Sequence, residues 1–384
     1  MTEPRGTDEY LVLCLVTLGD PRRLTGGYLY HLRMAQAAER HGARIVFVSF
    51  PERRFPLPAL AAPRVMRRAR RLGVRAILLD SIAAAFAGPW LLAASPAVPV
   101  IAVLHQPPGG VDHGRGRTSL QAPLDRLAYR RARLLLVASK RLAAQLAAAG
   151  IDPERIRVVP PGRDVAAAST AARDLRRGRR AALLCVANWV RHKGILELLE
   201  AIACLPPETA TLHLAGDAEV DPAYAARVRR RLAEPDLSTR VVVHGALPRE
   251  GVAALYACAD VFVLPGLRET YGTVFGEAMA FGLPVVGWRA GNLPYLADDG
   301  HQGLLVPPGD VRGLSRALER LATDPPLRER LGNAARRRAQ ARPTWEQSAD
   351  LFFAAIRSAL EDAGAAGATG PSSSPRRTAR GSRP

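Results

Sequence analysis

The sequence predicts an α/β protein made of two Rossmann-like domains, each with a doubly wound parallel sheet. Short apolar runs rich in β-branched residues alternate with longer helical segments along the chain, which is the order of βαβ units. Each run is hydrophobic almost throughout, as expected of a parallel strand that helices cover on both faces. The length of 384 residues leaves room for two cores, because domains average about 150 residues.

The first domain is expected over residues 1–164. Its predicted strands are the apolar runs 10–17, 43–50, 75–80, 98–105, 133–138 and 156–159. A Gly26-Gly27 pair follows the first run and precedes apolar side chains at the spacing of an amphipathic helix. We therefore expect a strand, a loop and a helix here, with the glycines at the helix start.

The second domain is expected over residues 165–345. The strand pattern stops in the turn-rich segment between Pro160 and Arg180 and then starts again. The predicted strands are 181–187, 211–215, 240–244, 261–264, 284–288 and 303–306. A last helix over 346–362 has apolar residues at helical spacing, and the Gly-, Ser-, Pro- and Arg-rich stretch 363–384 is expected to be disordered.

The composition excludes several classes of protein. Four cysteines without a C-x-x-C pair indicate neither a disulfide framework nor a zinc ribbon, and we expect small buried hydrophobes in a reducing compartment. The first ten residues lack the apolar core of a signal peptide, and there is no stretch of about 18 apolar residues to span a membrane. The sequence therefore predicts a soluble, cytoplasmic protein.

The net charge of +19 is concentrated in the first domain, because residues 1–164 carry +13. Eight arginines and no acidic residue lie between Arg53 and Arg75. One interpretation is a solvated helix face; the other is peripheral docking on an anionic membrane or an acidic acceptor. In the second interpretation an apolar stripe lies beneath the cations, formed by Val65, Met66, Ala69 and Leu72. Nucleic acid is not expected, because no recognition motif or aromatic cluster accompanies the arginines.

The most informative segment is residues 264–286, where a strand, a Gly-containing loop and a helix follow one another. The helix is expected to begin near Thr270, with Glu269 at its entrance and Glu277 two turns inside. Free backbone N–H groups at such a helix start bind anions. Here they belong to Tyr271, Gly272, Thr273 and Val274. A buried Glu277 needs polar partners, such as ribose hydroxyls; the alternative is that both glutamates are ordinary helix charges.

Residues 10–362 resemble the retaining glycosyltransferases of family 4, which have the GT-B fold. Glu269 and Glu277 match the E-x7-E region of that family. Further motifs follow in the family's order: Thr25-Gly26-Gly27, Val158-Val-Pro-Pro-Gly162, His192-Lys193-Gly194, Leu214-Ala-Gly-Asp217, Tyr256 to Asp260, Gly282-Leu-Pro-Val-Val and Gly303-Leu-Leu-Val-Pro-Pro-Gly309. The resemblance implies two domains that face each other across a cleft, and a C-terminal helix that crosses back to the first domain.

The resemblance also implies roles toward a nucleoside-diphosphate sugar. Glu277 would bind the donor ribose, Glu269 the transferring sugar, and Lys193 the leaving diphosphate. Lys193 is one of two lysines in the chain, although a cation at a helix start is commonly just solvated. The family's arginine five residues before this lysine is Asn188 here, which makes Arg191 the candidate substitute.

Three further sites follow from the resemblance. Gly26 and Gly27 would bring backbone N–H groups to the same phosphates, and His105 would lie beside the reacting sugar carbon. The nucleotide base would meet the loop formed by Gly245, Ala246 and Leu247. The first two also have structural explanations, because Gly-Gly pairs commonly mark loops and a histidine at a strand end is often a structural residue.

Together these features predict a metal-independent retaining glycosyltransferase with a nucleotide-sugar donor and no bound cofactor. No D-x-D triplet and no His/Cys/Asp/Glu set has metal-ligand spacing, and no dinucleotide or P-loop glycine motif occurs. The acceptor would be a hydroxyl of a lipid, a glycan or a small molecule. Two alternatives stay open: a GT-B sugar-nucleotide epimerase, which a product assay would separate, and a non-catalytic membrane- or nucleic-acid-binding protein on a degenerate transferase fold.

Overall fold

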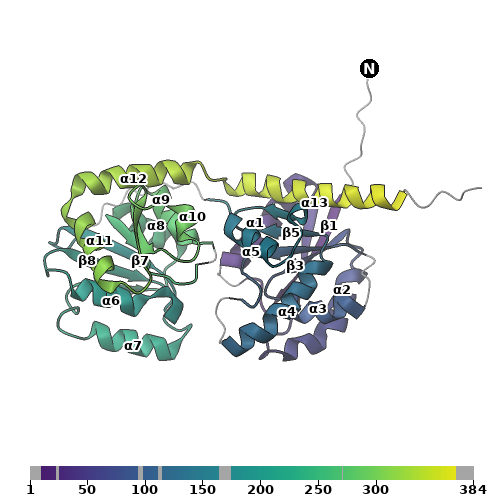
Figure 1. The fold of residues 1–384 in the computed structure, drawn as a ribbon, viewed down its shortest axis with the longest axis horizontal. Helices are drawn as coiled ribbons and strands as arrows, with labels where there is room; N and C mark the ends of the chain where they lie inside the picture. The colour runs from purple at the N-terminus through teal and green to yellow at the C-terminus, as the bar shows by residue number, and fades with distance from the viewer. Residues whose placement is uncertain are drawn as a thin grey trace, which may run out of the picture.

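The protein is described by a computed structural model that covers residues 10–22, 26–93, 98–110, 115–163, 174–269 and 271–368. Two α/β domains lie side by side, the first built from the N-terminal half of the chain and the second from the C-terminal half (Figure 1). Every predicted strand is present within two residues of its expected bounds. The expected domain boundary at residues 164 and 165 lies outside the described residues.

In the described part of the first domain, one sheet has six parallel strands in the order β2-β1-β3-β4-β5-β6. The strands are β1 Leu11–Leu18, β2 Ala43–Phe50, β3 Ala76–Asp80, β4 Val100–Leu104, β5 Leu134–Val137 and β6 Ile156–Val158. The helices are α1 Gly26–Ala37, α2 Ala62–Arg71, α3 Ala84–Ala93, α4 Arg115–Arg131 and α5 Lys140–Ala148.

The second domain repeats the architecture, with six described parallel strands in the order β12-β11-β10-β7-β8-β9. They are β7 Ala181–Val186, β8 Ala210–Ala215, β9 Val241–Gly245, β10 Val261–Val263, β11 Val285–Trp288 and β12 Gly303–Val306. The helices are α6 Ile195–Ala203, α7 Pro222–Leu232, α8 Arg249–Cys258, α9 Thr273–Ala280, α10 Leu293–Leu296, α11 Val311–Thr323 and α12 Pro325–Gln340.

The strand order reverses between β1 and β3 in the first sheet and between β7 and β10 in the second. Ligands of doubly wound sheets bind outside the carboxyl ends of the strands at such switch points. The fold therefore places one candidate binding edge in each domain.

The last helix, α13 Trp345–Ala368, crosses back from α12 and runs along the first domain (Figure 1). Its side chains Phe352, Phe353 and Ile356 are buried in one cluster with Leu13 and Tyr30 of the first domain. This confirms the expected crossing helix. The helix continues beyond the expected end at residue 362, because the alanine-rich run up to Ala368 favours helix; residues 369–384 lie outside the described part.

Two expectations about side chains need correction. Val65, Met66 and Ala69 of α2 are buried in the core of the first domain, so three of the four residues of the apolar stripe face inward. The fourth, Leu72 at the end of α2, is 40% exposed, and the arginines of that helix are exposed as well. Cys204 is exposed rather than buried, because it caps the end of α6 at the surface. Among the described helices, none combines the length and the apolar character that crossing a membrane requires.

Candidate active site

A cavity of about 1170 Å³ lies between the two domains, and we call it the cleft cavity. Its walls come from the loops that follow β3 and β4 in the first domain and β7, β8 and β10 in the second. These loops follow the carboxyl ends of the strands at both switch points, where the fold class places ligands. The cavity brings Gly27 and His105 opposite Lys193 and Glu269.

Lys193 and Glu269 meet on the wall of the cleft cavity. The ammonium of Lys193 donates a hydrogen bond to Glu269 Oε1 and forms an ion pair with it. The Lys193 and Glu269 side chains are 21% and 8% exposed, so the pair is mostly removed from water. Charge interactions are stronger in such a buried environment than in water. Two residues that the sequence analysis assigned to different parts of a donor therefore form one unit.

Close backbone packing brings this pair together. The turn that contains Lys193 ends at Gly194, whose φ is +71°. A β-carbon at Gly194 would collide with the carbonyl oxygen of Pro265, so only glycine permits this approach. The N–H of Leu267 also donates to the carbonyl of His192 over 2.8 Å, which fixes the two loops against each other.

The loop that carries Glu269 is held from behind by Asn292, which the sequence analysis missed. The Asn292 backbone N–H donates to the Glu269 carbonyl over 2.8 Å, and its side-chain Nδ2 donates to the Tyr271 carbonyl over 2.6 Å. A β-carbon at the preceding Gly291 would lie 2.7 Å from the Glu269 nitrogen. An asparagine after a glycine is an ordinary loop signal, so its role is apparent only in three dimensions.

Helix α9 begins at Thr273 rather than near Thr270, which lies outside the described residues. Gly272 precedes it at φ +77°, a left-handed conformation that starts the helix abruptly. No side chain caps this end, so the first-turn N–H groups keep the free positions of a helix N-terminus. Thr273 and Val274 line the cleft cavity, which gives that wall the positive end of a helix dipole.

His105 forms the opposite wall, at the end of β4. Its ring packs against Gly27, where a β-carbon would lie 3.4 Å from Cδ2, in ordinary van der Waals contact. Burial, with His31 nearby, lowers the pKa of His105 to about 3, which keeps the ring neutral. Its buried Nε2 has no hydrogen-bond partner among the described residues.

Behind His105 lies a buried polar cluster that the sequence analysis did not single out. Asp80, at the end of β3, accepts a hydrogen bond from Thr17 Oγ1 over 2.7 Å and lies 3.1 Å from His31 Nε2. Against the effect of burial, the neighbouring histidines and Thr17 hold the pKa of Asp80 at about 2. The rings of His31 and His105 pack edge to face at 4.8 Å between centroids. The cluster therefore joins β1, α1, β3 and β4 directly beneath the cleft.

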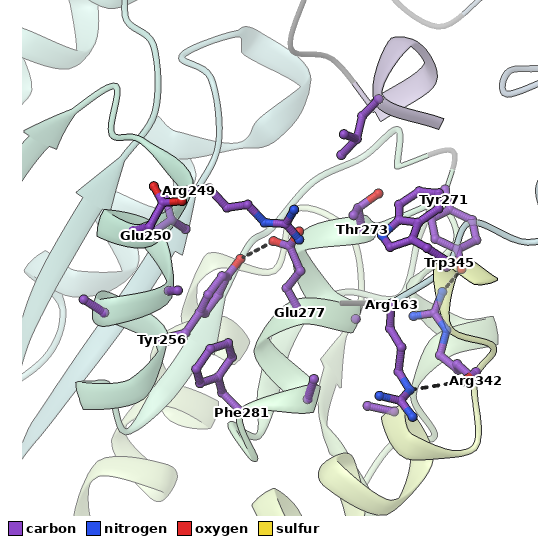
Figure 2. A pocket seen from close by; sticks show the side chains of 18 residues that line it. Arg163, Arg249, Glu250, Tyr256, Tyr271, Thr273, Glu277, Phe281, Arg342 and Trp345 are labelled. Carbon is purple, nitrogen blue, oxygen red and sulfur yellow. Dashed lines mark hydrogen bonds between the residues drawn. The ribbon is translucent and has the colours of Figure 1, made fainter. Parts of the chain in front are cut away.

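Glu277 lines a second cavity of about 440 Å³ between α8 and α9, which we call the α8–α9 cavity. Tyr256 donates its hydroxyl to Glu277 Oε2 over 3.2 Å, and the Arg249 side chain points toward the same carboxylate (Figure 2). Burial raises the pKa of Glu277, while Tyr256 and Arg249 oppose that shift. The cavity shares Tyr271 and Thr273 with the cleft cavity, so the two form a continuous wall along α9.

Tyr271 also connects the second domain to the segment between the domains. Its hydroxyl donates to the Pro161 carbonyl over 3.0 Å, and the Arg342 guanidinium lies 4.9 Å from its ring centroid and donates to the same hydroxyl. Burial lowers the pKa of Arg342 to about 10. Figure 2 shows Arg342, Tyr271 and Trp345 together at one end of the α8–α9 cavity.

Two family models match the chain. The model "Glycosyltransferase Family 4" matches residues 13–167, and "Glycosyl transferases group 1" matches residues 170–338. The two matches follow one another and include both walls of the cleft cavity. The chain belongs to glycosyltransferase family 4.

Named relatives match parts of this family 4 chain. The D-inositol 3-phosphate glycosyltransferase of Kribbella flavida is 40% identical over 146 residues, which are 38% of this chain and 34% of that protein. The MMP alpha-(1->4)-mannosyltransferase of Mycolicibacterium hassiacum is 35% identical over 231 residues, which are 59% of this chain and 54% of that protein. The matches thus span between about a third and about half of these relatives' length.

Solved structures share the fold of the family 4 chain. Sucrose-phosphate synthase from Thermosynechococcus elongatus aligns with a TM-score of 0.78 and 22% identity, covering 92% of this chain and all of that one (100%). Anabaena HepE in complex with UDP and glucose aligns with a TM-score of 0.74 and 19% identity, covering 91% of this chain and 100% of that one. These likenesses confirm the GT-B fold.

The remaining predicted residues of the family 4 chain lie at three places. Asn188 and Arg191 line the cleft cavity, where Asn188 Oδ1 also accepts from the Asp217 N–H over 3.3 Å. Gly26 begins α1. The predicted base-binding residues line neither cavity, namely Gly245, Ala246 and Leu247. Arg249 and Glu250, at the start of α8, line the α8–α9 cavity instead.

Across the described residues, no three His, Cys, Asp or Glu side chains are arranged to hold a metal ion.

Proposed function

We propose that this chain transfers a sugar from a nucleoside-diphosphate sugar to an acceptor hydroxyl, with retention at the anomeric carbon and without a metal ion. The observation that carries the proposal is the Lys193–Glu269 pair facing His105 across the cleft cavity. It combines a cation for a leaving diphosphate, a carboxylate for sugar hydroxyls and a neutral imidazole near the sugar. The named relatives are a glycosyltransferase and a mannosyltransferase, which supports the same class.

The donor lies along α9 in this proposal. Its diphosphate meets Lys193 and the first turn of α9, and its ribose meets Glu277 in the adjoining α8–α9 cavity. Carboxylates accept two hydrogen bonds well, as a ribose diol requires. Anabaena HepE, which shares the fold, was solved with UDP and with UDP-glucose, and this supports a nucleotide sugar as the donor.

In the chemical step the bond between the anomeric carbon and the diphosphate oxygen breaks, and its electron pair leaves with the diphosphate. The acceptor oxygen bonds to the same carbon from the same face, and its proton passes to the departing phosphate oxygen. Lys193 and the α9 N–H groups stabilise the charge that develops on that oxygen. His105 can hydrogen-bond a sugar hydroxyl through Nε2 and, being neutral, does not repel the positive charge that develops on the sugar ring.

The same arrangement supports metal independence. The positive charge that Mg²⁺ contributes in many phosphate-transfer enzymes comes here from Lys193 and the helix terminus. We therefore expect full activity in excess EDTA. Activity that disappears in EDTA and returns with Mg²⁺ or Mn²⁺ would contradict this part of the proposal.

The proposed function is tested by incubating the full chain with a panel of nucleotide sugars, including UDP-glucose, with and without hydroxyl acceptors. The expected product is a glycoside whose anomeric configuration, measured by NMR coupling constants, matches that of the donor. An inverted glycoside would exclude the retaining mechanism. A new sugar nucleotide or free sugar epimer without acceptor would identify an epimerase, and no binding or turnover of any nucleotide sugar would exclude both.

We also infer peripheral contact with an anionic membrane through the first domain. Leu57 and Leu60 in the turn before α2 are 49% and 79% exposed, and exposed arginines of α2 follow them directly. Exposed leucines beside cations suit an anionic bilayer surface, where each basic residue contributes about 1 kcal/mol. The buried Val65, Met66 and Ala69 of α2 take no part in this contact.

A further inference from the structure

The α8–α9 cavity extends beyond the part that the proposed donor uses. Figure 2 shows Glu250 at one side of the cavity, Arg163 and Arg342 at the other side, and Glu277 between them. We call the part lined by Arg163 and Arg342 the arginine end. The donor ribose is assigned to Glu277, so the arginine end has no role in the proposed reaction.

The arginine end carries positive charge without a matching negative charge. Arg163 donates from Nε to the Arg342 carbonyl over 3.1 Å and from a terminal nitrogen to the Gln340 carbonyl over 3.4 Å. The Arg342 guanidinium donates to the Tyr271 hydroxyl. These acceptors are neutral, and within the described part of the chain neither guanidinium is paired with a carboxylate. A charge that is partly removed from water is stabilised by an opposite charge, which here a bound anion would supply.

Aromatic and aliphatic side chains cover the wall beside the arginine end. The rings of Tyr256 and Phe281 pack with centroids 5.5 Å apart and planes at 22°, and both residues line the cavity. Val252, Ala253 and Ala280 continue this apolar surface. The cavity volume of about 440 Å³ falls within the about 300–1,000 Å³ typical of small-ligand sites. The lining therefore suits a flat aromatic ring whose negative group is directed at the arginines.

Both segments that connect the two domains contribute to the arginine end. The lining residues are Gly162 and Arg163 in the first segment and Arg342 and Trp345 in the second. The Arg163 N–H donates to the Pro343 carbonyl over 2.9 Å. A β-carbon at Gly162 would collide with the backbone of Trp345, so the two segments lie in close contact. A ligand at the arginine end would therefore contact both connections between the domains at once.

We propose that the arginine end of the α8–α9 cavity binds a small aromatic carboxylate, and that the bound carboxylate holds the two connecting segments together. Arg163 and Arg342 would supply the guanidinium N–H donors that match a carboxylate. The aromatic ring would lie on Tyr256 and Phe281. The site goes beyond the proposed function, because neither arginine takes part in sugar transfer.

The experiment uses 2-naphthoate and its uncharged amide, 2-naphthamide, as probes of the full chain. Isothermal titration calorimetry measures their binding to wild type, Arg163→Gln, Arg342→Gln and the matched control Arg337→Gln. Arg337 is an exposed arginine of α12 that does not line the cavity. We expect wild type and Arg337→Gln to bind 2-naphthoate roughly tenfold or more tightly than the amide. Arg163→Gln and Arg342→Gln should each lose roughly ten- to a hundredfold in 2-naphthoate affinity, as for one charge-assisted hydrogen bond.

Two results would overturn the carboxylate site: equal affinity of wild type for the acid and the amide, or unchanged 2-naphthoate affinity in the arginine variants. Arg163→Gln tests the site by itself if Arg342→Gln fails to fold, because Arg163 bonds only to backbone carbonyls among the described residues. UDP binding is measured on the same samples and should be unchanged in Arg163→Gln. A UDP Kd that rises as much as the 2-naphthoate Kd would place Arg163 in the donor site and contradict the proposal.

Hydrogen exchange tests whether the bound carboxylate holds the two segments together. In wild type, 2-naphthoate should slow amide exchange in peptides that cover residues 162–163 and in peptides that cover residues 341–345, because ligand contacts oppose local opening. Helix α7, on the opposite side of the second domain from α12 (Figure 1), should exchange as before. Arg163→Gln at the same probe concentration should lack the protection. Protection of one segment alone, or equal protection by the amide, would contradict the proposal.

Discussion

The two walls of the cleft cavity are built in different ways. The second domain contributes charged side chains that already have partners. Lys193 donates a hydrogen bond to Glu269, and Tyr256 donates one to Glu277. The first domain contributes His105, kept neutral above the buried Asp80 cluster. One wall is thus prepared to exchange its ion pair for a charged ligand, whereas the other holds an uncharged group in a fixed position.

The largest effect is expected from removing the cation of the second-domain wall. Lys193→Ala loses a charge-assisted contact with the diphosphate, which should lower kcat/KM by about ten- to a hundredfold. It also leaves Glu269 buried without its partner, so the variant should unfold at lower urea concentration. Steady-state kinetics and urea unfolding measure the two effects separately.

Lys193→Ala/Glu269→Gln is the control for this prediction. Neutralising the orphaned carboxylate should restore most of the lost stability and none of the activity. Wild-type kinetics in a folded Lys193→Ala protein would contradict a role of Lys193 in donor binding. The two walls would then no longer differ in offering a cation to the ligand.

The first-domain wall is best tested through pH. The folded-state pKa of His105 is about 3, below the value of about 6.5 for an unfolded histidine. Between these two pH values the unfolded chain is protonated at His105 and the native chain is not. The contribution of His105 to stability is therefore present above pH 6.5 and is lost as the pH falls toward 3, by about 2–3 kcal/mol at pH 4.5. His105→Gln should lack this loss.

Urea unfolding of wild type and His105→Gln at pH 7 and pH 4.5 checks the difference. The comparison between variants is needed because burial raises the pKa of Asp125 to about 6, which gives stability the opposite slope between pH 4 and 6. If the free energy of unfolding changes with pH in the same way in both proteins, burial does not lower the pKa of His105. The first-domain wall would then be accessible to water at His105.

A smaller effect is expected at Glu277. Tyr256→Phe removes one neutral hydrogen bond to Glu277 and should weaken nucleoside diphosphate binding by about 1 kcal/mol, or roughly fivefold. The Tyr256 hydroxyl favours the ionised Glu277 carboxylate, so Glu277 should take up a proton at a higher pH in Tyr256→Phe. As the pH is lowered, nucleotide affinity should therefore begin to fall at a higher pH in the variant than in wild type. Calorimetric titrations from pH 5 to 8 measure the nucleotide affinity of both proteins. An unchanged pH profile in the variant would contradict a contact between Glu277 and the nucleotide.

The smallest effect on catalysis is expected from the exposed arginines of α2. Replacing Arg67, Arg68, Arg70 and Arg71 by glutamine should reduce binding to vesicles that contain anionic lipid and leave UDP affinity unchanged. The loss should shrink with added salt, because exposed charges are screened over about 8 Å at physiological ionic strength. The matched control removes as many exposed arginines from the second domain, namely Arg312, Arg320, Arg330 and Arg337. Equal vesicle binding by both variants would reduce the patch to a solvated helix face.

The two sheets and the second-domain wall can be predicted from local sequence patterns. The strands are continuous apolar runs with turn residues between them, and Glu269, the α9 start and Glu277 lie within one short strand–loop–helix segment. Local order of this kind can be predicted, because neighbouring residues in a loop or a helix have nearly fixed positions relative to one another. Helix α9 begins at Thr273, a few residues later than predicted, directly after Gly272 in its left-handed conformation.

Which distant residues meet becomes apparent only in three dimensions. Lys193 and Glu269 are brought together by packing at Gly194, and Asp80, Thr17 and His31 come from three separate elements before they gather beneath His105. Asn292 has no local pattern that distinguishes it from an ordinary loop residue. Parallel strands bring their carboxyl ends to one edge whatever their separation in the chain. The identity of the residues that meet there therefore depends on strand order and domain placement, which no local pattern contains.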